Sequence, residues 1–283
     1  MGIKIVTDST GYIPKDVREK QNISVVSLSV NFGLDTYLEE EMDYNYFYER
    51  LSKSKDLPTS SQVTLNTLID CFENIVSVGH SVVGVFISSL MSGTYSTALK
   101  AKEMVIKKYP DAIIEIIDSK SNSMEMGFAV LAGAVAAKAE KPLKCVIDSI
   151  HNVIERSRFL FVPETLTYLK KGGRIGTASA LLGSILKIRP ILTVSDGMTT
   201  VFDKVRTKKK AVERIIEFFL EEIKDKGLSQ VVVHHINCES EGKELADFIK
   251  SRTNKEVPVY PIGPVVGLHV GPGTIGVAYH TTK

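Results

Sequence analysis

The sequence predicts an α/β protein made of two domains. In the first half of the 283-residue chain, short apolar runs alternate with helical stretches, an order typical of parallel sheets with helices on both faces. Near residue 157 this alternation ends, and strands and helices then follow in mixed order. A hairpin signal, Ser195-Asp196-Gly197, joins two strand-like runs there. We therefore expect a three-layer α/β/α domain with a parallel sheet at residues 1–157, and a two-layer α/β domain with a mixed sheet at residues 158–283.

The strands predicted for the first half are short, apolar and rich in β-branched residues. The run Val82-Val83-Gly84-Val85-Phe86-Ile87 is continuous, as expected of a central parallel strand. After it, Ala98, Ala101 and Met104 are good helix formers. The predicted strands are residues 3–7, 23–30, 81–88 and 113–118, and the predicted helices are residues 14–20, 44–52, 65–76, 96–109 and 123–139.

The second half begins after a helix predicted at residues 143–156. A long helix at 208–226 has apolar residues along one side, which indicates that it packs on a sheet. His234 and His235 are adjacent in a predicted strand, so they point to opposite faces and cannot chelate one metal ion. The other predicted strands are residues 158–162, 190–194, 199–205, 230–236, 257–262 and 274–280, and the other helices are residues 164–170, 177–186 and 240–251.

The composition is that of an ordinary globular protein. Hydrophobic residues make up 43% and charged residues 24%, and the net charge of +2 is too small to predict nucleic-acid binding. The cysteines Cys71, Cys145 and Cys238 show neither a disulfide framework nor metal-ligand spacing. A strand pattern begins at residue 3 with no signal peptide before it. We expect a cytoplasmic protein without metal, cofactor or nucleic-acid partner.

A serine-rich turn at residues 88–95 connects a predicted strand to a predicted helix. Such a turn directs free backbone N–H groups toward one point, and hydroxyl groups add further donors. No lysine or arginine lies in the turn, so a carboxylate or a single phosphate suits it better than a triphosphate. The alternative is that Ser92 or Thr94 only caps the helix.

Polar residues also follow two other strands of the predicted parallel sheet. They are Thr7-Asp8-Ser9-Thr10 and Asp118-Ser119. The carboxyl ends of parallel strands lie at one edge of a sheet, where ligands bind, so these residues should meet the turn at 88–95. The alternative is helix capping by Asp8, Ser9 and Ser119, and capping is the explanation we favour for Asp8 and Asp118.

The segment at residues 263–273 is rich in glycine and proline, which predicts a fixed, irregular loop. His269 lies in its middle. A histidine there can donate to a carboxylate, or it can simply bond a nearby carbonyl group. Residues 271–276 match G-x-G-x-x-G, but no helix follows and Pro272 lacks an N–H group, so we do not expect a dinucleotide site.

These segments, in this order, resemble the DegV family, whose members include the fatty-acid-binding subunits of bacterial fatty acid kinase. The resemblance covers nearly the whole chain, with departures at Val63 and Met91 that remove no polar ligand. The matching segments are residues 7–10, 58–62, 88–95, 118–119, 168–175 and 187–192 and the loop around His269.

The resemblance implies a long acyl chain buried between the two domains. Its carboxylate would be held by Ser60, Ser92 and His269. Gln62 would orient Ser60, and Thr94 would assist. Relatives often have threonine where this chain has Ser60. Ser61 would be a ligand or the N-cap of the helix at 65–76, and the apolar residues 178–186 would form a wall of the tunnel.

The resemblance also implies that the chain is not itself an enzyme. A separate fatty acid kinase subunit would phosphorylate the presented carboxylate to an acyl phosphate, a step of phospholipid metabolism. Arg174 and Arg206, the latter in the basic run at 204–210, would contact that partner. A charge run is also explained by a solvated helix start. Transient contact with a membrane surface is compatible with this role.

Two other functions remain open from the sequence. The chain could be a serine hydrolase-like enzyme in which Ser92 is the nucleophile and His269 its base, although no third residue is evident that would orient the imidazole. It could instead be a regulatory binding protein that uses the basic run.

Overall fold

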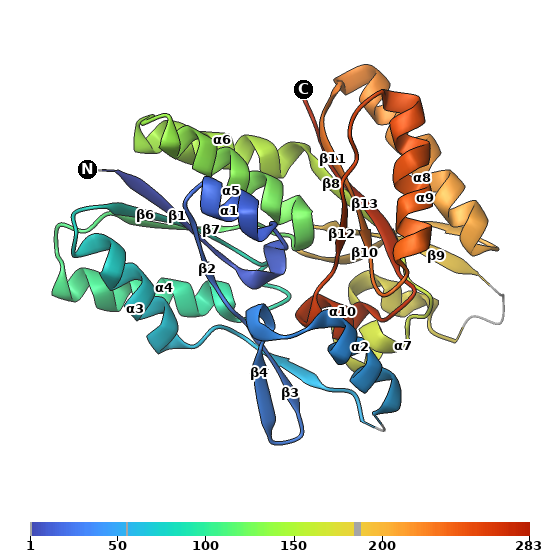
Figure 1. The fold of residues 1–283 in the computed structure, drawn as a ribbon, viewed down its shortest axis with the longest axis horizontal. Coiled ribbons are helices and arrows are strands. Elements are labelled where there is room, and N and C mark those ends of the chain that lie inside the picture. The colour runs from blue at the N-terminus through green and yellow to red at the C-terminus, as the bar shows by residue number, and fades with distance from the viewer. Residues whose placement is uncertain (1, 55, 184–187) are drawn as a thin grey trace.

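The computed structural model of the protein describes residues 2–54, 56–183 and 188–283, and it contains two large sheets that lie next to each other (Figure 1). The first sheet is parallel throughout, in the order β2-β1-β6-β7. Helices α3 (Leu65–Val76) and α4 (Thr94–Lys108) cover one face, and α5 (Ser123–Lys138) and α6 (Leu143–Arg156) cover the other. The three-layer prediction is confirmed. The strands are β1 (Ile3–Asp8), β2 (Ile23–Val26), β6 (Ser81–Phe86) and β7 (Ile114–Asp118).

The second sheet is mixed, in the order β10-β9-β8-β13-β11-β12, and only β11 and β12 pair in parallel. Helices α8 (Lys208–Lys226) and α9 (Glu239–Thr253) cover its outer face (Figure 1). The predicted hairpin is confirmed, because Asp196 and Gly197 have φ of 49° and 85°, as a type I′ turn requires. The strands are β8 (Ser157–Val162), β9 (Arg189–Ser195), β10 (Met198–Val205), β11 (Leu228–His235), β12 (Val259–Pro261) and β13 (Ile275–Thr281).

Helix α5 lies between the two sheets. It contacts β1 and β6 on one side and β8 and β13 on the other. This explains why its sequence is apolar around almost the whole circumference, since both sides are buried. The predicted division at residue 157 coincides with the start of β8, and whether the two parts fold as separate domains stays a prediction.

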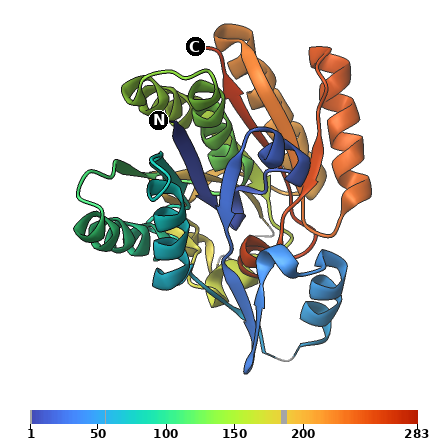
Figure 2. The ribbon, with the colours of Figure 1, turned by 60° about the vertical axis from the view of Figure 1, so that its left-hand side comes forward.

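A small antiparallel sheet was not predicted from the sequence. It consists of β3 (Ser29–Phe32), β4 (Asp35–Leu38) and β5 (Thr59–Ser61), and its hairpin projects at the lower edge of Figures 1 and 2. The strand predicted at 23–30 is confirmed in part: residues 23–26 form β2, but the chain then leaves the parallel sheet, and residues 29 and 30 belong to β3. The connection between β2 and β3 is held by the N–H of Leu28, which donates to Ser9 Oγ at 3.1 Å.

Short helical elements connect these sheets. The first are η1 (Ser9–Gly11) and α1 (Lys15–Lys20), followed by η2 (Glu39–Glu41) and α2 (Tyr44–Lys53) after the small hairpin. In the second half, α7 (Thr167–Lys171) follows β8.

Two predictions for the second half were wrong. The segment at 263–273 is not an irregular loop, because residues Pro264–Val270 form helix α10. Proline at the first helical position is compatible with this, since that N–H has no intrahelical partner. The helix predicted at 177–186 is instead the short 3₁₀ helix η3 (Gly176–Leu181), and Gly183, with φ of 84°, lies outside helical geometry. Residues 184–186 of that prediction lie outside the described residues.

Within the described ranges, no helix combines the length and the apolar character needed to cross a lipid bilayer. In the same residues, no group of three or more His, Cys, Asp or Glu side chains is placed to hold a metal ion.

Candidate functional site

The carboxyl ends of β1, β6 and β7 meet at one rim of the parallel sheet, as predicted. Asp8 is buried there and accepts hydrogen bonds from the N–H of Ile87 at 2.7 Å and of Thr10 at 3.0 Å. Its role is structural, so the capping explanation is correct for this residue. Burial raises the pKa of Asp8 to about 6, against the opposing effect of these hydrogen bonds. Ser88 Oγ donates to the carbonyl oxygen of Gly197 at 2.6 Å and so ties this rim to the β9–β10 hairpin.

A cavity of about 320 Å³ lies between this rim and the second sheet. Its volume is within the range of small-molecule sites. Polar groups that line it include Ser60, Ser92, Arg174 and His269. The apolar lining residues are Leu28, Ile87, Met91, Phe159, Phe161, Leu169, Val194, Ile262, Val265, Val266 and Val270.

Three elements that are distant in sequence bring the polar groups together. Ser60 is on β5, Ser92 is in the turn between β6 and α4, and His269 is in the last turn of α10. Ser60 Oγ lies 2.9 Å from Nε2 of His269. Ser92 Oγ lies 3.0 Å from Thr94 Oγ1 and accepts from the N–H of Thr94 at 3.2 Å. The cavity thus offers hydroxyl and imidazole groups from both halves of the chain.

The imidazole of His269 is neutral at physiological pH. Burial, with a smaller effect of the nearby positive Arg174, lowers its pKa to about 4. Its Nδ1 is buried and has no hydrogen-bond partner among the described residues. A buried donor without an acceptor is costly, so the proton belongs on Nε2, which then donates to Ser60. In this arrangement the Ser60 hydroxyl can donate its own proton into the cavity.

The other residues predicted to bind the ligand take different positions. Gln62 lines the cavity, but its amide donates to Thr97 Oγ1 at 2.6 Å, and no hydrogen bond joins it to Ser60. Thr94 is buried behind Ser92, and its hydroxyl accepts from the N–H of Val63 at 3.4 Å. Ser61 does not cap α3, because that role belongs to Thr64, which accepts from the N–H of Thr67 at 3.2 Å.

The two arginines predicted to contact a partner lie at different places. Arg174 is exposed at the cavity, where it donates to the carbonyl oxygens of Met91 at 3.1 Å and Gly172 at 2.7 Å. Arg206 is also exposed but lines a separate hollow of about 890 Å³ with Lys170 and Arg189.

The apolar wall was mostly missed from the sequence. Residues 178–183 do not line the cavity, and residues 184–186 of the predicted wall lie outside the described residues. The wall instead includes Phe159 and Phe161, which are two residues apart on β8 and therefore face the same side. Leu160 and Val162 face the opposite side and pack under α8 and α9. The alternation of phenylalanine with aliphatic residues along β8 was the signal that could have identified this wall.

Comparisons with known proteins agree with this fold. Residues 2–282 match the family described as "Uncharacterised protein, DegV family". The chain is 50% identical over 283 residues to a DegV domain-containing protein of Clostridium acetobutylicum, and the match covers 100% of this chain and 99% of the relative.

Solved structures with the same fold include two whose descriptions name a lipid ligand. "DegV, a fatty acid binding protein from Bacillus subtilis" is 33% identical, with a TM-score of 0.90 and 99% of each chain covered. A "fat acid (stearic acid)-binding protein from Eubacterium ventriosum" is 27% identical, with a TM-score of 0.91, and the match covers 99% of this chain and 98% of that one.

Proposed function

Because this chain belongs to the DegV family, we propose that it binds a long-chain fatty acid in the cavity between its two large sheets. The carboxylate lies at Ser60, Ser92 and His269, and the acyl chain lies along the apolar wall. One observation carries this proposal: hydroxyl and imidazole groups converge in a cavity whose other lining is mainly aliphatic and aromatic. The fatty acids named for the similar solved structures support the same ligand class.

The apolar wall provides most of the binding free energy. Burial of a sixteen-carbon chain at roughly 0.8 kcal/mol per CH₂ gives an upper limit of about 12 kcal/mol. Each hydrogen bond to a hydroxyl adds about 0.5–1.5 kcal/mol. The wall therefore determines affinity, whereas Ser60, Ser92 and His269 determine which end of the ligand faces outward.

The second part of the proposal is that the bound carboxylate is presented to a separate kinase subunit, which converts it to an acyl phosphate. Neutral hydroxyl donors support this role, because they leave a carboxylate oxygen more nucleophilic than a bidentate arginine would. Arg174, exposed at the cavity, would contact the kinase or its phosphates. Arg206 would add a second contact at its separate hollow.

In this proposal the chain performs no catalysis. A hydrolase would need Ser92 paired with an imidazole base, but the nearest hydroxyl partner of His269 is Ser60, and Ser92 is bonded to Thr94. Among the described residues, no carboxylate bonds Nδ1 of His269 to orient the ring.

Native mass spectrometry followed by denaturing extraction tests the ligand. Purified protein should carry a fatty acid, and the double variant Ser60→Ala, Ser92→Ala should bind it at least tenfold more weakly. Ser149→Ala is the matched control, because that hydroxyl lies on α6 and donates to the carbonyl oxygen of Val146, in its own helix. Absence of any bound lipid, together with no uptake of added fatty acid, would refute the proposal.

A second experiment tests presentation to the kinase. Arg174→Ala should leave fatty-acid binding intact and lower acyl-phosphate formation by an added kinase subunit. Lys144→Ala, an exposed lysine on α6, is the control. Equal losses of binding and phosphorylation in Arg174→Ala would contradict a docking role.

A further inference from the structure

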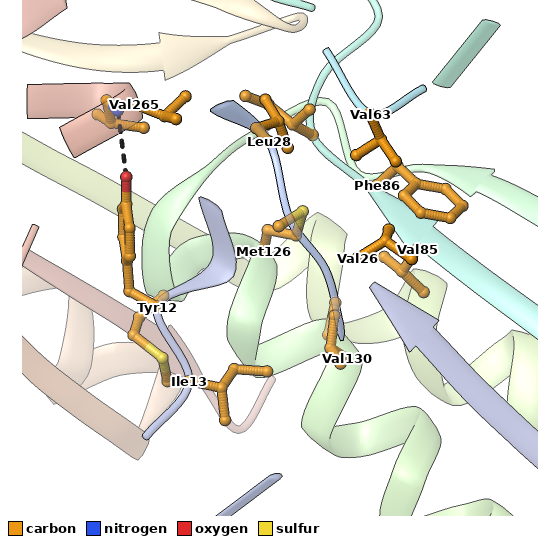
Figure 3. Packing of buried hydrophobic residues seen from close by; sticks show 14 of the residues in the cluster. Tyr12, Ile13, Val26, Leu28, Val63, Val85, Phe86, Met126, Val130 and Val265 are labelled. Atoms are coloured by element: carbon orange, nitrogen blue, oxygen red, sulfur yellow. Dashed lines mark hydrogen bonds between the residues drawn. The ribbon is translucent and has the colours of Figure 1, made fainter. Parts of the chain in front are cut away.

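The first turn of α10 is held by a buried carboxyl group that is distant in sequence. Pro264 has no N–H, so Val265 and Val266 carry the first free donors of this helix. The N–H of Val265 donates to Glu39 Oε1 at 2.8 Å, and the N–H of Val266 donates to Tyr12 Oη at 3.1 Å. Tyr12 Oη in turn donates to Glu39 Oε1 at 2.9 Å. In Figure 3 the phenol of Tyr12 points at this turn, beside Val265.

Glu39 is only 1% exposed, and its hydrogen-bond donors among the described residues are all neutral. Ser9 Oγ donates to its second oxygen. A buried carboxyl group that pairs with no basic side chain costs free energy unless its hydrogen bonds compensate for lost hydration. Here one of these hydrogen bonds also satisfies the N–H of Val265, a donor of α10 that would otherwise be buried without an acceptor. Glu39 thus performs the function of an N-cap, supplied from outside the helix.

Two glycines let α10 and the residue before it approach Glu39 and Tyr48 closely. A Cβ at Gly263 would lie 2.8 Å from Glu39 Oε1, and one at Gly267 would lie 2.0 Å from Tyr48 Oη. Tyr48 Oη also donates to the carbonyl oxygen of Ile262 at 2.7 Å. The backbone at Gly263 and at Gly267 is therefore in direct contact with Glu39 and Tyr48, respectively.

The same small unit of the fold also contacts the other end of α10. Glu39 directly follows β4, and its N–H donates to the carbonyl oxygen of Leu28 at 2.9 Å. β4 pairs with β3, and β3 pairs with β5, which carries Ser60. Glu39 therefore holds the first turn of α10, while Ser60 holds His269 in the last turn.

We propose that Glu39 is a positioning residue, which fixes α10 on the small sheet so that the imidazole of His269 stays in register with Ser60. This inference rests on the proposed function, because it predicts that Glu39 controls recognition of the ligand's carboxylate without touching the ligand. Glu39 does not line the cavity.

The test compares two ligands of equal length, hexadecanoic acid and hexadecan-1-ol, at pH 8. Burial raises the pKa of Glu39 to about 7, so pH 8 favours the ionised form of the carboxyl group. Glu39→Ala should weaken binding of the acid about tenfold, or about 1.4 kcal/mol, and leave binding of the alcohol within twofold. Glu39→Gln keeps the shape and one acceptor oxygen, so it should retain most of the preference for the acid.

Glu222→Gln is the control. The side chain of Glu222 is also largely buried, 8% exposed, but it lies on α8, where it accepts from Tyr279 Oη at 2.6 Å and pairs with Arg158. It should change neither affinity. Equal losses for the acid and the alcohol in Glu39→Ala would show a merely structural role and overturn the inference. Unchanged affinity for both ligands would overturn it as well.

A measurement on ligand-free protein separates this inference from the proposed function. The imidazole nitrogen signals of His269 should shift in Glu39→Ala and Glu39→Gln but not in Glu222→Gln, and identical spectra would overturn the inference. If the wild-type protein bound neither ligand, the proposed function would fail, and these spectra would still decide whether Glu39 positions His269. Should Glu39→Ala not fold, the imidazole signals of His269 in Glu39→Gln decide the question.

Discussion

Replacement of Gly172 by alanine should displace the imidazole of His269 and weaken fatty-acid binding. Gly172 has φ of −76°, a conformation that alanine adopts without strain. A Cβ there, however, would lie 2.2 Å from Nδ1 of His269 and 3.1 Å from the carbonyl oxygen of Tyr168. The ring would have to move by about 1 Å to reach the roughly 3.5 Å of a favourable contact.

The imidazole cannot simply slide away from the new methyl group. Its Nε2 already lies 2.9 Å from Ser60 Oγ, so the ring must rotate or the end of α7 must move. Either change disrupts hydrogen bonding to the bound carboxylate, which is worth about 1.5–3 kcal/mol for a charged group. Affinity for a long-chain fatty acid should fall roughly ten- to hundredfold.

Gly173→Ala is the matched control, because there the added methyl group strains the backbone but collides with no neighbouring atom. Gly173 has φ of 70°, and nothing lies within 4 Å of its Cβ position. That variant should lose about 1–2 kcal/mol of stability to backbone strain and keep its affinity. Displacement of a fluorescent fatty acid measures binding, since the chain has no tryptophan, and circular dichroism measures the thermal midpoint. If Gly172→Ala bound the ligand as tightly as Gly173→Ala, the imidazole would not belong to the carboxylate site.

Three further predictions concern buried groups. Burial raises the pKa of Glu125 to about 7 from its usual 4.5, so the stability that its protonation contributes is present below pH 4.5 and is lost as pH rises through 7. Chemical denaturation should therefore show Glu125→Gln gaining about 3 kcal/mol relative to the wild type between pH 4.5 and 8; a pH-independent difference would contradict the assignment. A bound carboxylate should raise the pKa of His269 from about 4. NMR titration of the imidazole ring with and without fatty acid measures this change, and an unchanged pKa would place the carboxylate elsewhere. Gly267→Ala should destabilise the fold by about 2–4 kcal/mol in urea unfolding. The reason is that the new Cβ would collide with Tyr48 Oη and disrupt the hydrogen bond from Tyr48 to the carbonyl oxygen of Ile262. A loss of stability below about 0.5 kcal/mol would show that α10 can shift.

The parallel sheet and the polar rim were predictable because both depend on local patterns. Continuous β-branched runs such as β6 predict buried parallel strands, and Asp8, Ser88 and Asp118 follow such runs directly. The proposed roles of Ser60 and His269 came from the resemblance to a family, since neither residue lies in a pattern that identifies a site by itself. Their contact across 209 residues depends on the packing of α10 against the small sheet.

The elements that were mispredicted are those whose conformation is determined by distant partners. Glycine and proline in 263–273 indicate an irregular loop when only local propensity is considered. The segment is helical because Glu39 and Tyr12 satisfy the N–H groups of Val265 and Val266 from more than 220 residues away. The β3–β4 hairpin was missed for a similar reason, because its strands are short and half exposed, with little periodicity to detect.

The amino-acid sequence alone determined the alternation of strands and helices, the parallel sheet and the polar residues at its edge, because hydrophobic periodicity and turn chemistry act over a few residues. Only the tertiary structure decided which apolar faces enclose the cavity, which hydroxyl meets the imidazole, and which buried carboxyl group holds the helix that carries it. Those outcomes depend on close contacts between segments brought together by packing, and no local pattern encodes the distance between two such segments.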